Sequence, residues 1–322
     1  MTVHVISVGT SLRDFFEKGH LEREGRNVPG GEEAREQWNK DKLGFDEGVY
    51  DTVARLEDAF GLESGFDAPL HNALASFKEL SQDVQAKRWA SVPGLSAELD
   101  TVRTHDPMMV KDEDLTILLS SDTEDGRACA VWTAIALARG DVERVLYLHG
   151  IDQHTRLTRP EHGRIIVLCL KGLDAQQDAE FIQATEGLGY LARLLIGNRV
   201  HRIEPLLKHQ EKVHFHLTGG YRATVPYLIA TVEWLRSLSR DAQAHILPEN
   251  AEKTVHIPLR RMDPRQVGLE LAGFNERAEA PAVPERALLE GYAYERSGKG
   301  AELTVFGRGM RILFEEYMER GR

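Results

Sequence analysis

The sequence predicts an α/β protein built on a doubly wound, mostly parallel sheet. Two observations indicate this: short, nearly continuous apolar segments recur along the chain, and longer helical segments stand between them. Strands of a parallel sheet covered by helices on both faces have such apolar runs, because neither face of the strand meets water. Polar turns follow several of these segments, which is typical of the ligand-binding edge of such sheets.

The expected elements alternate along the chain. Val3–Val8 is a β-rich segment, and residues 13–94 follow with charged, helix-like sequence that we interpret as a mostly helical insertion. Ser96 is a typical N-cap for the next helix. The remaining expected elements are a helix to Arg103, strand Leu115–Ser120, helix Glu124–Arg139, strands Val145–His149 and Ile165–Leu170, helix Asp174–Val200, strand Val213–Leu217, a helix over residues 221–238 and strand Ala244–Leu247.

These elements divide the chain into two parts. Residues 1–250 are expected to form the α/β domain, and residues 251–322 a linker and a small C-terminal helical appendage. Residues 274–286 are rich in alanine, proline and glutamate, which favours a linker. Ala301–Arg320 contains the spacing of a short amphipathic helix.

The composition restricts the possible partners. The formal net charge is −11, so we do not expect long DNA or RNA as a partner, because affinity for it comes largely from basic surface. A small polyanion needs only local donors in one pocket. No apolar segment reaches the ~18 residues of a membrane span, and the N-terminal residues do not resemble a secretory signal. We therefore expect a cytoplasmic protein without a membrane partner, in which Cys129 and Cys169 are small buried hydrophobes.

Three polar turns are expected to meet at one edge of the sheet, because ligands of open α/β sheets bind beyond the carboxyl ends of the strands. Each turn contains a hydroxyl and leads toward a helix, whose free N–H groups and dipole attract phosphate. The turns are Gly9, Thr10 and Ser11; Ser121, Asp122 and Thr123; and Thr218, Gly219 and Gly220 with Arg222. Helix capping is the simpler explanation of the first two turns, whereas a double glycine followed by arginine favours an anionic ligand.

Histidines give a weaker signal. His214 and His216 lie two residues apart on an expected strand and point to one face, but no third ligand has matching spacing, so we interpret both as structural. Three further histidines gather near an acidic residue without any zinc spacing: His149, His154, His162 and Asp152. The sequence also lacks a Walker loop and a dinucleotide fingerprint after the first strand. We therefore expect no metal and no cofactor.

Four segments, taken in order, resemble the CRISPR-associated Rossmann-fold (CARF) proteins. They are VISVGTSL, LSAELDTV, LTILLSSDTEDGRACA and VHFHLTGGYRATVPYLIA, and the similarity runs from residue 1 to about residue 250. The LTVFG segment near the C-terminus is also similar. The resemblance is to the group that contains CARF-only proteins and standard ring nucleases. It implies a Rossmann-like sheet and a two-fold homodimer that binds a cyclic oligoadenylate, usually the tetra-adenylate, across its axis.

By this resemblance the three turns form the ligand site. Some CARF proteins also cut the ring without a metal, when a ribose 2′-hydroxyl attacks the adjacent phosphate. Ring nucleases of this type use the serine of the first turn and a lysine after the double glycine. Ser11 matches that serine, but Arg222 stands at the lysine position. Arginine keeps the charge and offers a bidentate fork, yet it cannot donate a proton as lysine can.

The sequence leaves three functions open. The first is binding and cleavage of a cyclic oligoadenylate, with Ser11 and Arg222 as catalytic residues, which would end a type III CRISPR antiviral response. The second is a sensor that binds the ring uncut and signals through the appendage or a partner protein. The third is a messenger-activated ribonuclease, because Arg156–His162 has the Arg-then-His spacing of HEPN ribonucleases, although a proline-containing loop carries it. Ring cleavage is the function that we expect.

Overall fold

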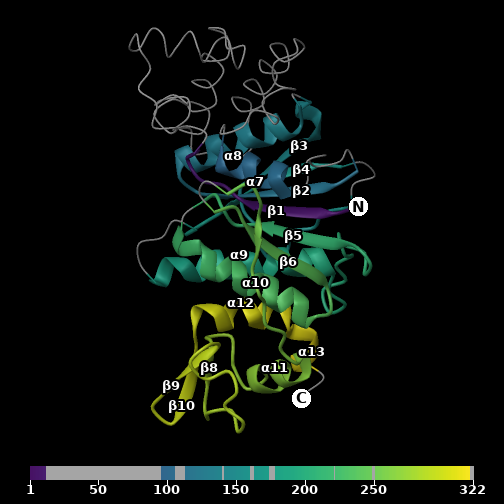
Figure 1. Ribbon diagram of the computed structural model, residues 1–322. Helices are drawn as coiled ribbons and strands as arrows, with labels where there is room; N and C mark the ends of the chain where they lie inside the picture. The colour runs from purple at the N-terminus through teal and green to yellow at the C-terminus, as the bar shows by residue number, and fades with distance from the viewer. Residues whose placement is uncertain are drawn as a thin grey trace, which may run out of the picture.

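The computed structural model describes residues 1–11, 96–105, 113–139, 141–159, 163–173, 178–220, 222–248 and 251–319. The helical insertion predicted for residues 13–94 lies outside the described residues. Within the described segments the chain forms a mostly parallel, seven-stranded sheet with helices on both faces (Figure 1), so the predicted α/β class is confirmed.

The strand order of this sheet is β3-β4-β2-β1-β5-β6-β7. The strands are β1 (Val3–Ser7), β2 (Leu115–Ser121), β3 (Val145–Leu148), β4 (Ile165–Leu170), β5 (Lys212–His216), β6 (Asp241–Ile246) and β7 (Val255–His256). Strands β1 to β6 run parallel, and β7 pairs with β6 in the antiparallel sense. Strands β2, β4 and β3 lie on one side of β1, and β5, β6 and β7 lie on the other side. The switch point of the sheet therefore lies between β1 and β5.

Helices cover both faces of the sheet. They are α7 (Ala97–His105) and α8 (Glu124–Leu137) on one face, and α9 (Asp178–Ile196) and α10 (Val225–Ser237) on the other (Figure 1). Ser96 is the predicted N-cap of α7, since its Oγ accepts a hydrogen bond from the N–H of Leu99 at 3.1 Å. Short 3₁₀ turns, η1 (Val142–Arg144) and η2 (Arg222–Thr224), precede β3 and α10.

The two faces of the central strands differ in chemistry. Val3, Val5 and Phe215 are at most 1% exposed and join residues of α9 and α10 in the main hydrophobic core. Alternate positions of the same strands carry His4 and His214, and α7 lies over them. The apolar face accounts for the stability of the sheet through burial, whereas the histidine face needs another explanation. Both cysteines are buried and free, as interpreted from the sequence.

The C-terminal part differs from the predicted linker and helical appendage. It contains α11 (Pro264–Leu271), β8 (Glu279–Ala280), β9 (Tyr294–Ser297), β10 (Gly300–Leu303), α12 (Val305–Leu313) and α13 (Glu315–Glu319). The three strands form an antiparallel sheet of order β8-β10-β9. Residues 274–286 are not a linker, because they supply β8 and bury Phe274 and Ala278 in the common core. Helix α12 packs along α9, which joins this part to the α/β domain (Figure 1).

Candidate functional site

The turns after β1 and β5 meet at the switch point of the sheet. A Cβ atom on Gly9 would lie 2.8 Å from the backbone nitrogen of Gly220, and one on Gly220 would overlap the hydroxyl of Ser7. Gly220 also has a φ of +85°, a conformation that glycine adopts without strain. Only glycines allow the two turns to approach this closely. The structure therefore brings the first and third predicted turns together.

Glu98 lies between these two turns. Its Oε1 accepts a hydrogen bond from the N–H of Gly9 at 2.8 Å, and its Oε2 accepts one from the Ser11 hydroxyl at 2.5 Å. A Cβ on Gly219 would overlap the Glu98 carboxyl group. Glu98 is 1% exposed, so an almost fully buried carboxylate occupies the place where the two turns converge. Ser11 also accepts a hydrogen bond from the N–H of Ala97 at 3.2 Å, which fastens the first turn to the start of α7.

No motif or spacing in the sequence indicates a role for Glu98 at this edge. Its first-turn position in α7 suits an acidic residue, because the helix dipole favours a negative charge there. That local explanation gives no sign that the side chain contacts a turn 87 and 89 residues away.

The second predicted turn follows β2, the other neighbour of β1. Thr123 is the N-cap of α8, and its Oγ1 accepts a hydrogen bond from Gly126 and lies 2.7 Å from the hydroxyl of Ser121. Asp122 is exposed, and its Oδ1 accepts a hydrogen bond from Gly172 at 3.4 Å. The capping interpretation of this turn is confirmed. Because β2 is parallel to β1 and pairs with it, the turn after β2 lies at the same edge of the sheet as the other two turns.

The other predicted residues of this edge have distinct positions. Thr10 and Arg222 are exposed. Arg222 opens the 3₁₀ turn η2 and precedes α10, which begins at Val225, so it does not lie in the first turn of that helix as predicted. Thr218 has a structural contact, since its Oγ1 accepts a hydrogen bond from the N–H of Leu247 at 2.8 Å and holds the end of β6.

The histidine face contains more residues than the predicted pair His214 and His216. His214 and His216 are joined by His105 from the end of α7, His245 from β6 and His4 from β1. Burial, together with the neighbouring imidazoles, lowers the pKa of His214 to about 4 and the pKa of His245 to about 3. The same causes hold the pKa of His216 well below its ordinary value. These three imidazoles are therefore neutral at pH 7.

Arg156, from the HEPN-like spacing, and the acidic residue Asp152 do not belong to this edge. Arg156 donates to the backbone oxygens of Gln153 and Thr155 at 2.8 and 3.0 Å, so its guanidinium stabilises a loop. His162, the other member of the HEPN-like spacing, lies outside the described residues. Asp152 accepts hydrogen bonds from the N–H groups of His154 and Thr155, which explains its place in the same loop.

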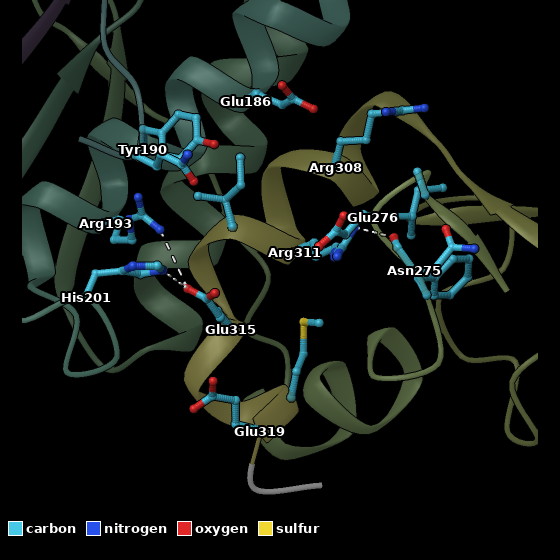
Figure 2. A pocket seen from close by; sticks show the side chains of 16 residues that line it. Glu186, Tyr190, Arg193, His201, Asn275, Glu276, Arg308, Arg311, Glu315 and Glu319 are labelled. Atoms are coloured by element: carbon cyan, nitrogen blue, oxygen red, sulfur yellow. Dashed lines mark hydrogen bonds and ion pairs between the residues drawn. The ribbon is translucent and has the colours of Figure 1, made fainter. Parts of the chain in front are cut away.

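A hollow of about 640 Å³ lies elsewhere, between α9 and the C-terminal helices (Figure 2). Arg193 and His201 both reach Glu315 there, at 3.6 and 2.8 Å. Arg308 and Arg311 of α12 face the same space with acidic side chains around them. None of the described residues that line this hollow belongs to the three turns. Since Glu315 already pairs with Arg193 and His201, we assign no ligand to this hollow.

Comparisons with known proteins add no family to these observations. No protein-family model matches the sequence, and no curated protein matches it significantly. Among the described residues, no helix combines the length and apolar character of a membrane span.

Proposed function

We propose that this chain is a CARF protein that binds a cyclic oligoadenylate, with the tetra-adenylate as the first candidate, and cleaves it as a metal-independent ring nuclease. The observation that carries the proposal is the contact between the Gly9–Ser11 turn and the Gly219–Gly220 turn at the switch point of the sheet. Ligands of open α/β sheets bind at this place. Glycine backbone at strand ends lets phosphate groups approach closely.

The proposed assembly is a homodimer in type III CRISPR signalling. A cyclic oligoadenylate with an even number of nucleotides has a two-fold axis, so two copies of the same edge would make equivalent contacts with it. The net charge of −11 does not oppose this binding, because a small ring meets only the donors of the site. Long nucleic acid and membranes are not proposed as partners.

The proposed chemistry places Ser11 next to the attacking hydroxyl. Since Ser11 gives its own proton to Glu98, its Oγ acts as an acceptor, and a ribose 2′-hydroxyl of the ring would donate to it. The 2′-oxygen forms a bond to phosphorus while the bond from phosphorus to the 5′-oxygen breaks. The 2′-proton passes toward Ser11 and Glu98, and solvent protonates the leaving oxygen. The linear product carries a 2′,3′-cyclic phosphate at one end and a 5′-hydroxyl at the other.

The remaining residues would stabilise charge. Gly219 and Gly220 supply backbone N–H groups at the phosphate. Arg222, exposed beside the third turn, would pair with the non-bridging oxygens, whose negative charge grows as the phosphorane-like transition state forms. The N–H of Gly9 already donates a hydrogen bond to Glu98. A phosphate group would therefore bind next to the Glu98 carboxylate or replace it as the acceptor of this hydrogen bond.

The test is incubation of the purified protein with cyclic tri-, tetra- and hexa-adenylate in the presence of a chelator, followed by chromatography. Loss of one ring and formation of a linear product with a cyclic phosphate end are expected. Ser11→Ala and Arg222→Ala should slow cleavage by ~10²–10⁴-fold, and Arg222→Lys should retain it. Arg164→Ala is the matched control, because Arg164 is exposed at the amino end of β4. Wild-type cleavage by both alanine variants would overturn the proposal.

A sensor without cleavage is the second candidate. Two observations favour it: arginine stands at the lysine position of the resembling ring nucleases, and Glu98 already accepts hydrogen bonds from Gly9 and Ser11. An intact ring that co-elutes with the protein after long incubation would select this function. Ring-dependent degradation of linear RNA would instead indicate the ribonuclease effector.

A further inference from the structure

Three histidines from separate elements converge on the face of the sheet that α7 covers. His105 ends α7, His214 lies in β5 and His245 lies in β6. One ring nitrogen of each lies within 4.8 Å of a ring nitrogen of both others. Nδ1 of His214 and Nε2 of His245 are only 3.0 Å apart. His214 and His245 are buried, and His105 is half-buried.

We propose that His105, His214 and His245 bind one divalent transition-metal ion, and that Zn²⁺ is the ion that fits best. Tetrahedral zinc with Zn–N distances of ~2.0–2.1 Å places its nitrogen ligands ~3.3 Å apart. The His214–His245 pair already has nearly this spacing. The ring nitrogen of His105 lies at most 4.8 Å from the other two nitrogens. It therefore needs to move by at most ~1.5 Å to reach the ~3.3 Å spacing, and rotation of its side chain can supply this movement.

A hydrogen bond between two imidazoles is the simpler explanation of the 3.0 Å pair. It does not explain the third ring, since the centroid of His105 lies 4.1 Å from that of His245 and 4.7 Å from that of His214. Imidazole nitrogens are good ligands for zinc, copper, nickel and iron. Three such ligands with an open fourth position are the usual donor set of zinc sites that retain a bound water.

The prediction of no metal site depended on spacing along one strand. His214 and His216 lie two residues apart, but the proposed ligands are His214 and two histidines that the sheet order and α7 bring to it. His216 instead pairs with His4, whose Nδ1 lies 3.1 Å from the Nε2 of His216. The two histidine pairs therefore lie side by side on one face, and α7 supplies the third ligand to only one of them.

The proposed ion would fix α7 to β5 and β6. His105 and Glu98 are 7 residues apart (105 − 98), which corresponds to about 10 Å along the helix. The metal would thus hold the helix that contacts Gly9 and Ser11 without contacting a ring bound there. A metal in this position is consistent with metal-independent cleavage, because the ion would not contact the ring. If the metal site is absent, ring cleavage remains possible, and if the ring is not cleaved, the metal site remains possible.

The test uses the full chain without a polyhistidine tag. The protein is stripped with a chelator, titrated with Zn²⁺ in a calorimeter and analysed for bound metal. One ion per chain is expected. His105→Ala and His245→Ala should each weaken Zn²⁺ binding by at least ~100-fold. Removal of a residue that only hydrogen-bonds a metal ligand already lowers metal affinity by ~10–100-fold, and removal of the ligand itself should lower it more. His209→Ala is the matched control, since His209 is exposed and outside the cluster, and it should bind like the wild type.

A second measurement covers the case in which a variant does not fold. The wild-type protein is loaded with Co²⁺, and its visible absorption and X-ray absorption spectra are recorded. Intense d–d bands of a four-coordinate ion with nitrogen ligands are expected. Failure of the wild type to bind Zn²⁺ or Co²⁺ at micromolar concentration would overturn the proposal. Unchanged affinity in both His105→Ala and His245→Ala would also overturn it.

Discussion

Glu98 places a negative charge against two donors that a phosphate group also needs, the N–H of Gly9 and the hydroxyl of Ser11. If the ring binds there, Glu98→Gln should tighten binding on the order of fivefold, because it removes a repulsion of about 1 kcal/mol. Cleavage should become slower, because glutamine cannot take the proton that passes through Ser11. Calorimetric affinity and single-turnover cleavage would measure the two effects separately.

Glu113→Gln is the matched control for this charge effect. Glu113 is exposed and precedes β2, so it lies at the amino end of the strands, away from the turns. Equal tightening by both variants would mean that Glu98 acts only through the net charge. Weaker binding by Glu98→Gln would mean that the carboxylate holds the turns open for the ligand.

Gly220 has the most restricted position in the three turns. It has a φ of +85°, and a Cβ there would overlap Ser7, which is 1% exposed. Gly220→Ala should therefore lower the free energy of unfolding by ~1–3 kcal/mol and abolish ring binding, because the two turns can no longer touch. Gly150→Ala should have little effect, since a Cβ on Gly150 meets nothing within 4 Å. Chemical denaturation of both variants, with a binding assay, would test this.

At the scale of elements, α12 and α9 cross with glycines in contact. A Cβ on Gly189 would lie 2.7 Å from the carbonyl oxygen of Gly309, and a Cβ on Gly309 would lie 2.8 Å from that of Thr185. Helix propensity alone predicts that Gly309→Ala stabilises α12 by about 1 kcal/mol. The close packing predicts the opposite, a loss of ~1–3 kcal/mol, because backbone atoms cannot move aside. The sign of the change in thermal denaturation would show which effect dominates.

The elements that the sequence predicts well are those with strong local patterns. LTILLS and IIVLCL are continuous apolar strands in the centre of the sheet, and both were placed to within one residue. Strand β6 begins at Asp241, three residues before its predicted start, because pairing with β5 extends it through a polar segment. Strand β9, YERS, has one buried residue and no apolar periodicity, so only its pairing with β10 makes it a strand.

The same distinction applies to the candidate site. The three turns were predicted because each lies next to a recognisable strand, and parallel strands end at a common edge. Glu98 and the histidine cluster were missed because their contacts join distant segments. His105, His214 and His245 come from one helix and two strands, and no spacing within a single element indicates that they meet. The strand order, which the sequence did not predict, brings His214 and His245 together, and the packing of α7 on the sheet adds His105 and Glu98.

At the scale of the whole molecule, a group of charges joins two loops and the N-terminus at the amino ends of the strands. Arg159 makes two hydrogen bonds to Glu211, at 2.5 and 2.8 Å. Glu211 also accepts a hydrogen bond from the N–H of Lys208 at 2.7 Å and lies 3.7 Å from the N-terminal ammonium group. The side chain of Glu211 is 14% exposed, so these contacts are partly shielded from water.

These contacts predict how stability depends on pH. Hydrogen bonds from Arg159, then from Lys208, lower the pKa of Glu211 below its ordinary value of 4.5. The unfolded chain therefore binds a proton near pH 4.5 while the folded chain does not, so Glu211 stabilises the fold above that pH. This contribution should decline as the pH falls from about 4.5 through the lowered pKa of the folded state.

Glu211→Gln should separate this contribution from other acid effects. At pH 7 the variant should lose ~1–3 kcal/mol of unfolding free energy, because glutamine is nearly isosteric but neutral and leaves Arg159 without its charged partner. At low pH the two proteins should converge, because a protonated glutamate resembles glutamine. Glu204→Gln, at an exposed position in the same loop, should follow the wild type at every pH. Urea denaturation between pH 7 and 3 would measure the three curves. A constant difference between Glu211→Gln and the wild type across this range would show that the lost stability arises from packing and not from charge.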